Sequence, residues 1–214
     1  LDVQFMTEDT IHLKPFLECI FTYHFSHFTS LLYNNQYQHS LYRQIKYHIV
    51  ELFSFGMINH PLYTKRLIVS NNVLVKLASI MQYYQYDIQL ICSIIRLYRK
   101  AIGEKDHAYI HQIVTRQLLS PMMKIFQDNG ARYNLLNSLV IELLTFIHTE
   151  NIEPLVEYIV IQHCPSFKQV VYTDVFLNLI HLHQSNTQSY WNNNPQNTTQ
   201  NGGSQNGGSQ NTGT

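Results

Sequence analysis

Histidine and cysteine are the residue types in this sequence that first suggest chemistry, with 12 His and 3 Cys among 214 residues. His24 and His27 are spaced to share one face of a helix. His181 and His183, two residues apart, would face in different directions. Neither pair has a third ligand or a carboxylate pair nearby, so the spacing does not indicate a metal site. We expect no metal and no cofactor.

The three cysteines, Cys19, Cys92 and Cys164, are far apart and form no C-x-x-C pair. Such an arrangement is typical of free, buried thiols in a protein of the cytosol or nucleus. The sequence also lacks a G-x-S-x-G turn, a P-loop and the glycine cluster of a dinucleotide site. Nothing in it argues for catalysis, and we expect a protein that is not an enzyme.

Charged residues are scarce, at 13% of the chain against roughly 25% in a typical soluble domain. Between Arg43 and Lys124 stand 11 Lys and Arg against 4 Asp and Glu, whereas residues 128–174 hold 2 against 6. The basic region Arg43–Lys124 raises one alternative, a helical-repeat protein that binds nucleic acid through salt-sensitive contacts with phosphates. A solvated surface, or a patch for an acidic protein partner, explains the same charges.

The stretch DNGARYNLLNSLVIELLTFI, Asp128 to Ile147, combines an apolar helix with uncharged hydrogen-bonding residues. A helical wheel of the predicted helix 131–148 places Tyr133 and most leucines on a wide apolar half, which indicates burial against two neighbours. Asn134 and Asn137 fall on the other half. Their amides could lock the preceding turn to the next helical unit, or bind the backbone of a partner. The sequence slightly favours the first alternative.

Helical periodicity continues along the chain, and strand-like alternation is scarce. Asn71 and Asn72 are expected to cap the helix that begins at Val73. Gly103 is expected to end a helix, and Pro154 to lie in the first turn of another. The predicted helices cover residues 12–33, 39–58, 62–69, 72–83, 86–102, 107–115, 118–127, 131–148, 152–163 and 168–183.

Internal repeats emerge when the sequence is shifted by 45 residues. IVELFSF at 49–55 then matches IIRLYRK at 94–100, and a further shift of 46 brings in VIELLTF at 140–146. Units of about 45 residues match the period of armadillo and HEAT repeats. We therefore predict an all-α, armadillo/HEAT-like α-solenoid over residues 1–183. A helical bundle with accidental internal similarity is the alternative.

From Gln184 onward the sequence is almost entirely Asn, Gln, Ser, Thr and Gly. Such a segment cannot bury enough apolar surface to offset the entropy of ordering it, so we predict a disordered tail over 184–214. Charged and polar residues interrupt the longest apolar runs before the roughly 18 residues that a membrane span requires. We expect no membrane segment.

The Asp128–Ile147 stretch also carries a resemblance, together with RLYRKAIGEKDHAYIHQIVTRQLLSPMMKIF before it and TENIEPLVEYIV after it. These segments resemble the central domain of regulatory subunit 3 of protein phosphatase 4, the SMEK family. The resemblance is strong from about Leu41 to Val160 and fades after Cys164. The family's N-terminal motif-reading domain has no counterpart here, so the chain is expected to be a fragment or a truncated paralogue.

The resemblance implies a non-catalytic regulatory and scaffold subunit. Members of the family join a phosphatase 4 catalytic subunit and a second regulatory subunit, and they direct the enzyme to phosphoprotein substrates. The same resemblance implies a location in the nucleus and cytoplasm and a role in the response to DNA damage. It makes nucleic acid the less favoured partner.

Two groups of residues are the candidates for partner binding. Each group could instead hold the repeats together, and the sequence leaves both alternatives open. The first group is the family's block, Asp128, Asn129, Gly130, Arg132, Tyr133, Asn134 and Asn137. The second group lies on the preceding repeat and comprises Arg96, Arg99, Lys100, Glu104, Lys105 and Asp106.

Overall fold

The computed structural model describes residues 23–33, 40–85, 87–167 and 172–193, together with Pro15 and Cys19. Within these residues the secondary structure is helical and contains no strand, which confirms the predicted all-α class. The helices are α2 (Phe25–Tyr33), α3 (Ser40–Asn59), α4 (Pro61–Ser70), α5 (Val73–Tyr83), α6 (Ile88–Gly103), α7 (His107–Thr115), α8 (Ser120–Asn129), α9 (Leu135–Thr149), α10 (Glu153–Gln162), the 3-10 turn η3 (Cys164–Phe167) and α11 (Val175–Asn193).

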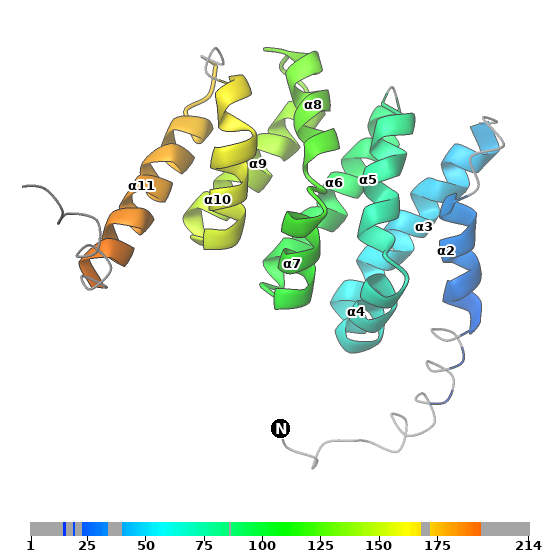
Figure 1. Cartoon of the computed structure of the whole chain (residues 1–214). Helices are drawn as coiled ribbons and strands as arrows, with labels where there is room; N and C mark the ends of the chain where they lie inside the picture. Colours follow the sequence, from blue (N-terminus) through cyan, green and yellow to red (C-terminus); the bar gives the residue numbers. More distant parts are fainter. Residues whose placement is uncertain are drawn as a thin grey trace, which may run out of the picture.

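The helices stack along one direction, as Figure 1 shows, with α2 and α3 at one end and α11 at the other. Helix α6 packs between α3 and α9, α5 packs between α2 and α8, and α7 packs against α10. Each of these contacts joins helices three places apart in the chain. That pattern is the signature of a three-helix repeat whose copies bury one another's apolar faces. The predicted α-solenoid is therefore confirmed.

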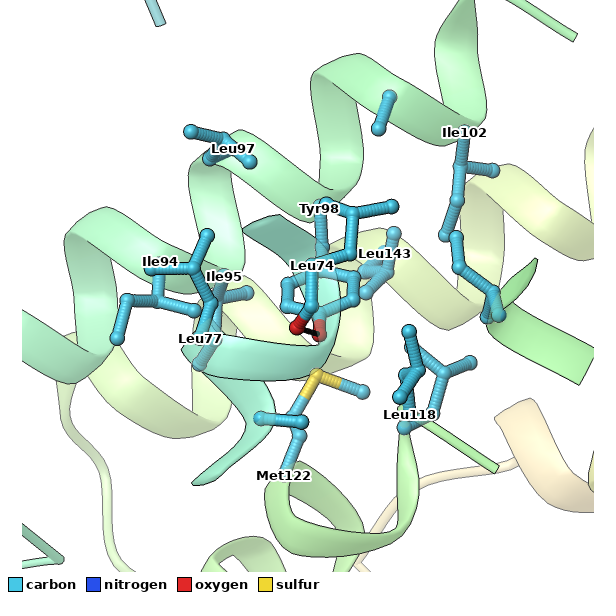
Figure 2. Packing of buried hydrophobic residues seen from close by; sticks show 14 of the residues in the cluster. Leu74, Leu77, Ile94, Ile95, Leu97, Tyr98, Ile102, Leu118, Met122 and Leu143 are labelled. Carbon is cyan, nitrogen blue, oxygen red and sulfur yellow. Dashed lines mark hydrogen bonds between the residues drawn. The ribbon is translucent and has the colours of Figure 1, made fainter. Parts of the chain in front are cut away.

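The apolar positions aligned by the 45-residue shift share one continuous core. Leu74 and Leu119 are both buried, and so are Leu77 and Met122. Figure 2 shows Leu74, Leu77, Tyr98 and Met122 meeting in this cluster. The Tyr98 hydroxyl donates to the Leu74 carbonyl at 2.8 Å, which satisfies the one polar group of a fully buried ring. Burial raises the pKa of Tyr98 and keeps the phenol neutral.

The backbone repeats with the same period as the core. Asn72 and Gln117, 45 residues apart, both adopt positive φ angles, 50° and 52°. Lys105 and Asn151, 46 residues apart, do the same at 51° and 43°. The left-handed conformation is uncommon for non-glycine residues. Its recurrence at equivalent turns therefore supports a common repeat architecture.

The predicted cap at Asn72 is wrong in its detail. Asn72 holds the N-cap position of α5, but its side chain makes no capping hydrogen bond because the residue is left-handed. Its Oδ1 atom accepts a hydrogen bond from Gln112 Nε2 on α7 at 3.0 Å, which links two repeats. The other two predictions are confirmed, since α6 ends at Gly103 and Pro154 lies in the first turn of α10.

Helix α11 differs most from the prediction, because it begins at Val175 rather than 168 and continues to Asn193. The predicted start of the disordered tail at residue 184 is therefore wrong, because the helix continues to Asn193. Helix α11 packs against α9 and α10. Asn186 and Asn151 also exchange side-chain hydrogen bonds at 2.9 and 3.3 Å. These tertiary contacts hold a stretch whose composition alone favours no helix. Residues 194–214, and residues 12–14, 16–18 and 20–22 of the predicted helix 12–33, lie outside the described residues.

The cysteines only partly follow the expectation of buried thiols. Cys92 and Cys164 are free and buried, and burial raises the pKa of the Cys164 thiol to about 11. Cys19 is free but exposed, so the prediction is wrong for that residue. No helix in the described part of the chain is long and apolar enough to cross a membrane.

Candidate functional site

The turn between α8 and α9 is built by three asparagine side chains. Asn134 precedes α9 as its N-cap, and its Oδ1 atom accepts from the backbone N–H of Asn137 at 3.0 Å. Asn129 Nδ2 donates to the Oδ1 atoms of Asn134 and Asn137, at 3.1 and 2.7 Å. Asn134 Nδ2 donates back to Asn129 Oδ1 at 3.3 Å. These bonds join the last helix of one repeat to the first helix of the next.

Asn137 is the centre of this turn and is only 4% exposed. Its Nδ2 atom donates to the carbonyls of Gly130 and Arg132, at 2.7 and 2.8 Å. Together with the bond from Asn129, these contacts use both of its donor hydrogens and its acceptor. The Asn137 amide therefore holds the turn, which favours the first of the two alternatives left open by the sequence.

Gly130 ends α8 with φ 63° and ψ −153°. This combination is accessible to glycine and strained for residues that carry a Cβ atom. The conformation turns the chain so that the Gly130 carbonyl reaches the Asn137 amide. The backbone conformation of Gly130 thus determines the shape of the turn.

The prediction is wrong about the residue at which α9 begins and about which of its side chains are buried. The helix begins at Leu135, four residues later than predicted, because Asn134 caps it. Tyr133 therefore lies before the helix and is fully exposed, and Leu135 is also exposed. Asn137, predicted on the polar half, is buried. The expected burial on two sides is otherwise correct, since α9 packs against α6, α8, α10 and α11.

Arg132 and Tyr133 are the side chains that this fixed turn presents to solvent. Arg132 lies at the rim of a surface hollow of about 670 Å³, together with Asp128 and Asn129. Asp128 forms an exposed ion pair with Lys124, at 3.1 Å along α8. The structure thus brings three predicted residues, Asp128, Asn129 and Arg132, to one hollow.

Sequence reasoning missed the other side of this hollow. Its lining includes Lys124 and Leu136, and Gln85 and Ile88 from the region where α6 begins. Ile88 also lines a neighbouring hollow of about 580 Å³, formed with α3 residues such as Arg43. The two hollows therefore adjoin along the edge formed by the starts of α3, α6 and α9. A 45-residue shift places Ile88 on Tyr133, and this repeat equivalence is the signal that could have identified it.

The second predicted group consists mainly of residues that connect repeats. Arg99 on α6 pairs with Glu142 on α9 at 2.9 Å, and its guanidinium lies 3.3 Å from the Phe146 ring centroid. Lys105 pairs with Glu150 at 2.5 Å. Lys100 Nζ, which is 3.3 Å from the Ser54 carbonyl of α3, reaches the repeat on the other side.

Asp106 serves two contacts at the start of α7. Its carboxylate pairs with Lys65 of the preceding repeat and also accepts from the Ala108 backbone N–H at 2.9 Å. The hydrogen bond from Lys65 holds the pKa of Asp106 below its usual value, and the hydrogen bond from the Ala108 backbone N–H lowers it further. Among the second group, only Arg96 and Glu104 remain exposed without a contact of this kind in the described part of the chain.

The basic region Arg43–Lys124 does not form a simple positive face. Lys46 and Lys76 are buried. Five other cations are matched by carboxylates, namely Arg43, Lys65, Arg99, Lys105 and Lys124. Lys100 is directed at a carbonyl. Arg66, Arg96 and Arg116 are exposed, and no carboxylate among the described residues pairs with them. The neutralisation of the other cations weakens the argument for nucleic-acid binding.

A serine hydroxyl and a histidine ring meet where α8 and α10 pack together. Ser120 Oγ lies 3.1 Å from the Tyr158 hydroxyl and 3.4 Å from His163 Nε2, which itself lies 3.2 Å from that hydroxyl. Burial lowers the pKa of His163, so its ring is neutral at pH 7. No carboxylate in the described part of the chain contacts the imidazole, and these bonds connect α8, α10 and the following turn. The described residues also hold no group of three or more potential metal ligands.

Fold and site together define a helical-repeat protein whose polar side chains join neighbouring repeats and shape one exposed turn. The sequence profile of "Phosphatase 4 regulatory subunit 3" matches residues 3–185. The chain therefore belongs to the phosphatase 4 regulatory subunit 3 family, and the resemblance carried by the Asp128–Ile147 stretch is confirmed.

Two curated relatives illustrate the range of the family. "Protein PPP4R3C1" of Mus musculus is 37% identical over 131 residues, which are 61% of this chain and 16% of the relative. "Suppressor of Mek1" of Dictyostelium discoideum is 33% identical over 149 residues, 64% of this chain and 14% of the relative. The chain thus spans about one-seventh to one-sixth of these relatives. No solved structure shows significant similarity.

Proposed function

We propose that this chain is a non-catalytic scaffold within a phosphatase 4 complex, where it holds the catalytic subunit and a second regulatory subunit near phosphoprotein substrates. The observation that carries the proposal is the family match over residues 3–185, which spans nearly all of the helical stack. The regulatory role follows from the family, and the placement of substrates is the further step. We extend the proposal to a location in the nucleus and cytoplasm.

The mechanism is one of placement. A stack of repeats joined by ion pairs keeps its surface shape, so two partners bound to it stay close to each other. Closeness of this kind raises the effective concentration of the substrate at the enzyme without any new contact between them. A rigid surface also reduces the entropy lost on binding.

The turn between α8 and α9 is the contact we assign to a phosphatase subunit. Its backbone is fixed by Asn129, Asn134 and Asn137, so Arg132 and Tyr133 are presented in a defined position. Tyrosine and arginine are enriched among the residues that dominate binding at protein interfaces. The adjoining hollow offers room for a side chain of the partner.

Co-purification tests this proposal. The tagged full chain is expressed in its source cells, and the eluate is examined by mass spectrometry for the phosphatase 4 catalytic subunit and the second regulatory subunit. We expect both, at comparable yield in low and moderate salt. A parallel preparation of an unrelated helical-repeat protein serves as the control.

The same preparation examines the nucleic-acid alternative. If the eluate holds no phosphatase subunit, and instead holds RNA or DNA that dissociates steeply with salt, the scaffold proposal is wrong. Replacement of Arg66, Arg96 and Arg116 by alanine would then reduce the salt dependence, because each phosphate contact contributes to the slope.

A further inference from the structure

The turn between α8 and α9 begins with an asparagine followed by a glycine, Asn129 and Gly130. In such a pair the backbone nitrogen of the glycine can attack the Cγ atom of the asparagine side chain. The side-chain nitrogen leaves as ammonia, which carries away the proton of the attacking N–H, and a cyclic succinimide forms. Water then opens the ring at one of its carbonyls and gives aspartate or isoaspartate. Glycine favours the attack because it has no Cβ atom to obstruct it.

The backbone of α8 opposes this attack. The helix extends through Asn129, and a helical backbone directs each N–H at carbonyls of the preceding turn. The Gly130 N–H accordingly donates to the carbonyls of Phe126 and Gln127, at 3.2 and 3.1 Å. The nitrogen that would attack therefore keeps its proton and its position for as long as the end of the helix is intact.

The side chain of Asn129 is held as well. Its Nδ2 atom donates to the Oδ1 atoms of Asn134 and Asn137, at 3.1 and 2.7 Å. Asn137 is fixed in turn by its bonds to the carbonyls of Gly130 and Arg132. Rotation of the Asn129 amide toward the Gly130 nitrogen breaks the bonds to both asparagines. The reaction therefore requires a local opening of the turn.

Solvent reaches Asn129 without such an opening. The residue is half-buried and lines the surface hollow of about 670 Å³. Water for the second step is thus at hand, and the ammonia released in the first step can leave through the same hollow.

The product cannot rebuild the closed turn. An aspartate at position 129 has an oxygen where Asn129 has Nδ2, so the donor to Asn134 and Asn137 is lost. The Oδ1 atom of Asn137, a residue only 4% exposed, then faces another acceptor, which is unfavourable for a buried group. Isoaspartate also lengthens the backbone by one methylene group at the point where α8 meets the turn.

We propose that Asn129 is a site of spontaneous deamidation controlled by the α8–α9 turn. The closed turn protects the side chain, each opening exposes it to attack, and the product holds the turn open. Water is the one co-reactant. The site follows from the Asn-Gly pair and the bonds of the turn, so it does not depend on the proposed function. Its consequence is the loss of the defined position of Arg132 and Tyr133.

Peptide mapping of the full chain by mass spectrometry measures the reaction. Trypsin releases residues 125–132, in which Asn129 is the only asparagine. During incubation at pH 8, Asn129 of the native chain is expected to deamidate at least about tenfold more slowly than the same residue in a synthetic peptide of residues 125–132, because the turn is mostly closed.

Two variants examine the control by the turn. Asn137→Ala removes the bonds to the Gly130 and Arg132 carbonyls and is expected to speed deamidation at least about tenfold relative to the wild type. Ser138→Ala is the matched control, since its exposed hydroxyl bonds only to the Asn134 carbonyl, and it is expected to leave the rate unchanged.

A further variant reproduces the product. Asn129→Asp is expected to raise the rate of backbone hydrogen exchange over residues 130–134 about tenfold, because the turn has lost its donor. Gln127→Glu makes the same change from amide to carboxylate at an exposed position two residues away. It is expected to exchange like the wild type, which separates the lost donor from the added charge.

Three results would overturn the proposal. Deamidation of the native wild type as fast as that of the synthetic peptide would show that the turn gives no protection, whatever the variants do. An unchanged rate in Asn137→Ala would show that the turn does not control the reaction. Wild-type hydrogen exchange in Asn129→Asp would show that the product leaves the turn closed. If circular dichroism shows that Asn137→Ala has lost helix, the wild type in sub-denaturing urea replaces it, with the same acceleration expected.

Discussion

At the scale of single residues, Asn137 shows how a polar side chain can be both buried and structural. It satisfies two carbonyls of a turn that contains no regular secondary structure. The Asn137 amide is itself buried, and a buried polar group without partners is costly because it has lost its hydrogen bonds to water. The turn therefore depends on this side chain more than on those of its exposed neighbours.

Asn137→Ala is accordingly expected to lower the free energy of unfolding by about 2–3 kcal/mol, since it leaves two carbonyls and the Asn129 amide short of partners. Urea denaturation monitored by circular dichroism measures the change. Ser138→Ala is the control one residue away. Its exposed hydroxyl bonds only to the Asn134 carbonyl, and its loss is expected to cost under about 0.5 kcal/mol. Equal effects of the two variants would contradict the role assigned to Asn137.

His163 gives the molecule a specific dependence on pH. Burial lowers the pKa of its imidazole below the ordinary value of 6.5. The unfolded chain therefore binds the proton more readily, and the free energy of unfolding must decrease as the pH falls through about 6.5. His163→Gln is expected to reduce this decrease between pH 7.5 and 5.5 in urea titrations. His181→Gln, at an exposed site on α11, is the control substitution.

At the scale of the helices, charge pairs connect successive repeats. Lys65 with Asp106, and Lys105 with Glu150, join side chains 41 and 45 residues apart. Such pairs are half-exposed, so each contributes little stability on its own. Their value lies in fixing the position of one repeat against the next.

Variants at Lys65 and Asp106 separate the contribution of the ion pair from that of the helix cap. Lys65→Met is expected to cost about 0.5 kcal/mol at pH 7, because the pair is partly exposed. Asp106→Ala also removes the cap of α7, so it is expected to cost about 1–2 kcal/mol. The pKa of Asp106 is lowered, hence its contribution is present above about pH 3.8 and is lost as the pH falls through the folded value. Urea titrations at pH 7 and pH 3 should show the difference between wild type and Asp106→Ala shrinking in acid.

Helices and their repeat were predictable from the sequence because apolar spacing repeats the same buried positions in each unit. The pairs Leu74 with Leu119 and Leu77 with Met122 show this directly. The ends of helices were less predictable. Asn134 starts α9 only because its amide finds Asn129 and the N–H of Asn137. Contacts of this kind, like those of Asn186, join residues whose proximity no local pattern reveals.

The candidate site was predictable only in part for the same reason. The family's block located the turn, and the structure leaves Arg132 and Tyr133 exposed there. The charges of Arg99, Lys105 and Asp106 suggested a binding surface, yet each meets a side chain of a neighbouring repeat. Composition records how many charges a chain has, and only the fold decides which of them remain unpaired.

At the scale of the whole molecule, the described helices stack along one direction from α2 and α3 to α11, with the α8–α9 turn at the junction of two repeats. Such a molecule offers an extended and rigid surface. This surface suits the holding of other proteins, which is the function proposed for this member of the phosphatase 4 regulatory subunit 3 family.

Equilibrium binding of the purified full chain to a complex of the phosphatase 4 catalytic subunit and second regulatory subunit tests the central claim most directly. Isothermal titration calorimetry should show saturable binding that Arg132→Ala/Tyr133→Ala weakens at least about tenfold, or ~1.4 kcal/mol. Thermal unfolding should stay unchanged in that variant, because both side chains are exposed. Arg116→Ala, at an exposed site on the preceding repeat, should bind like the wild type. Absence of binding by the wild-type chain would contradict the scaffold function, and undiminished binding by the double variant would remove the turn from the interface.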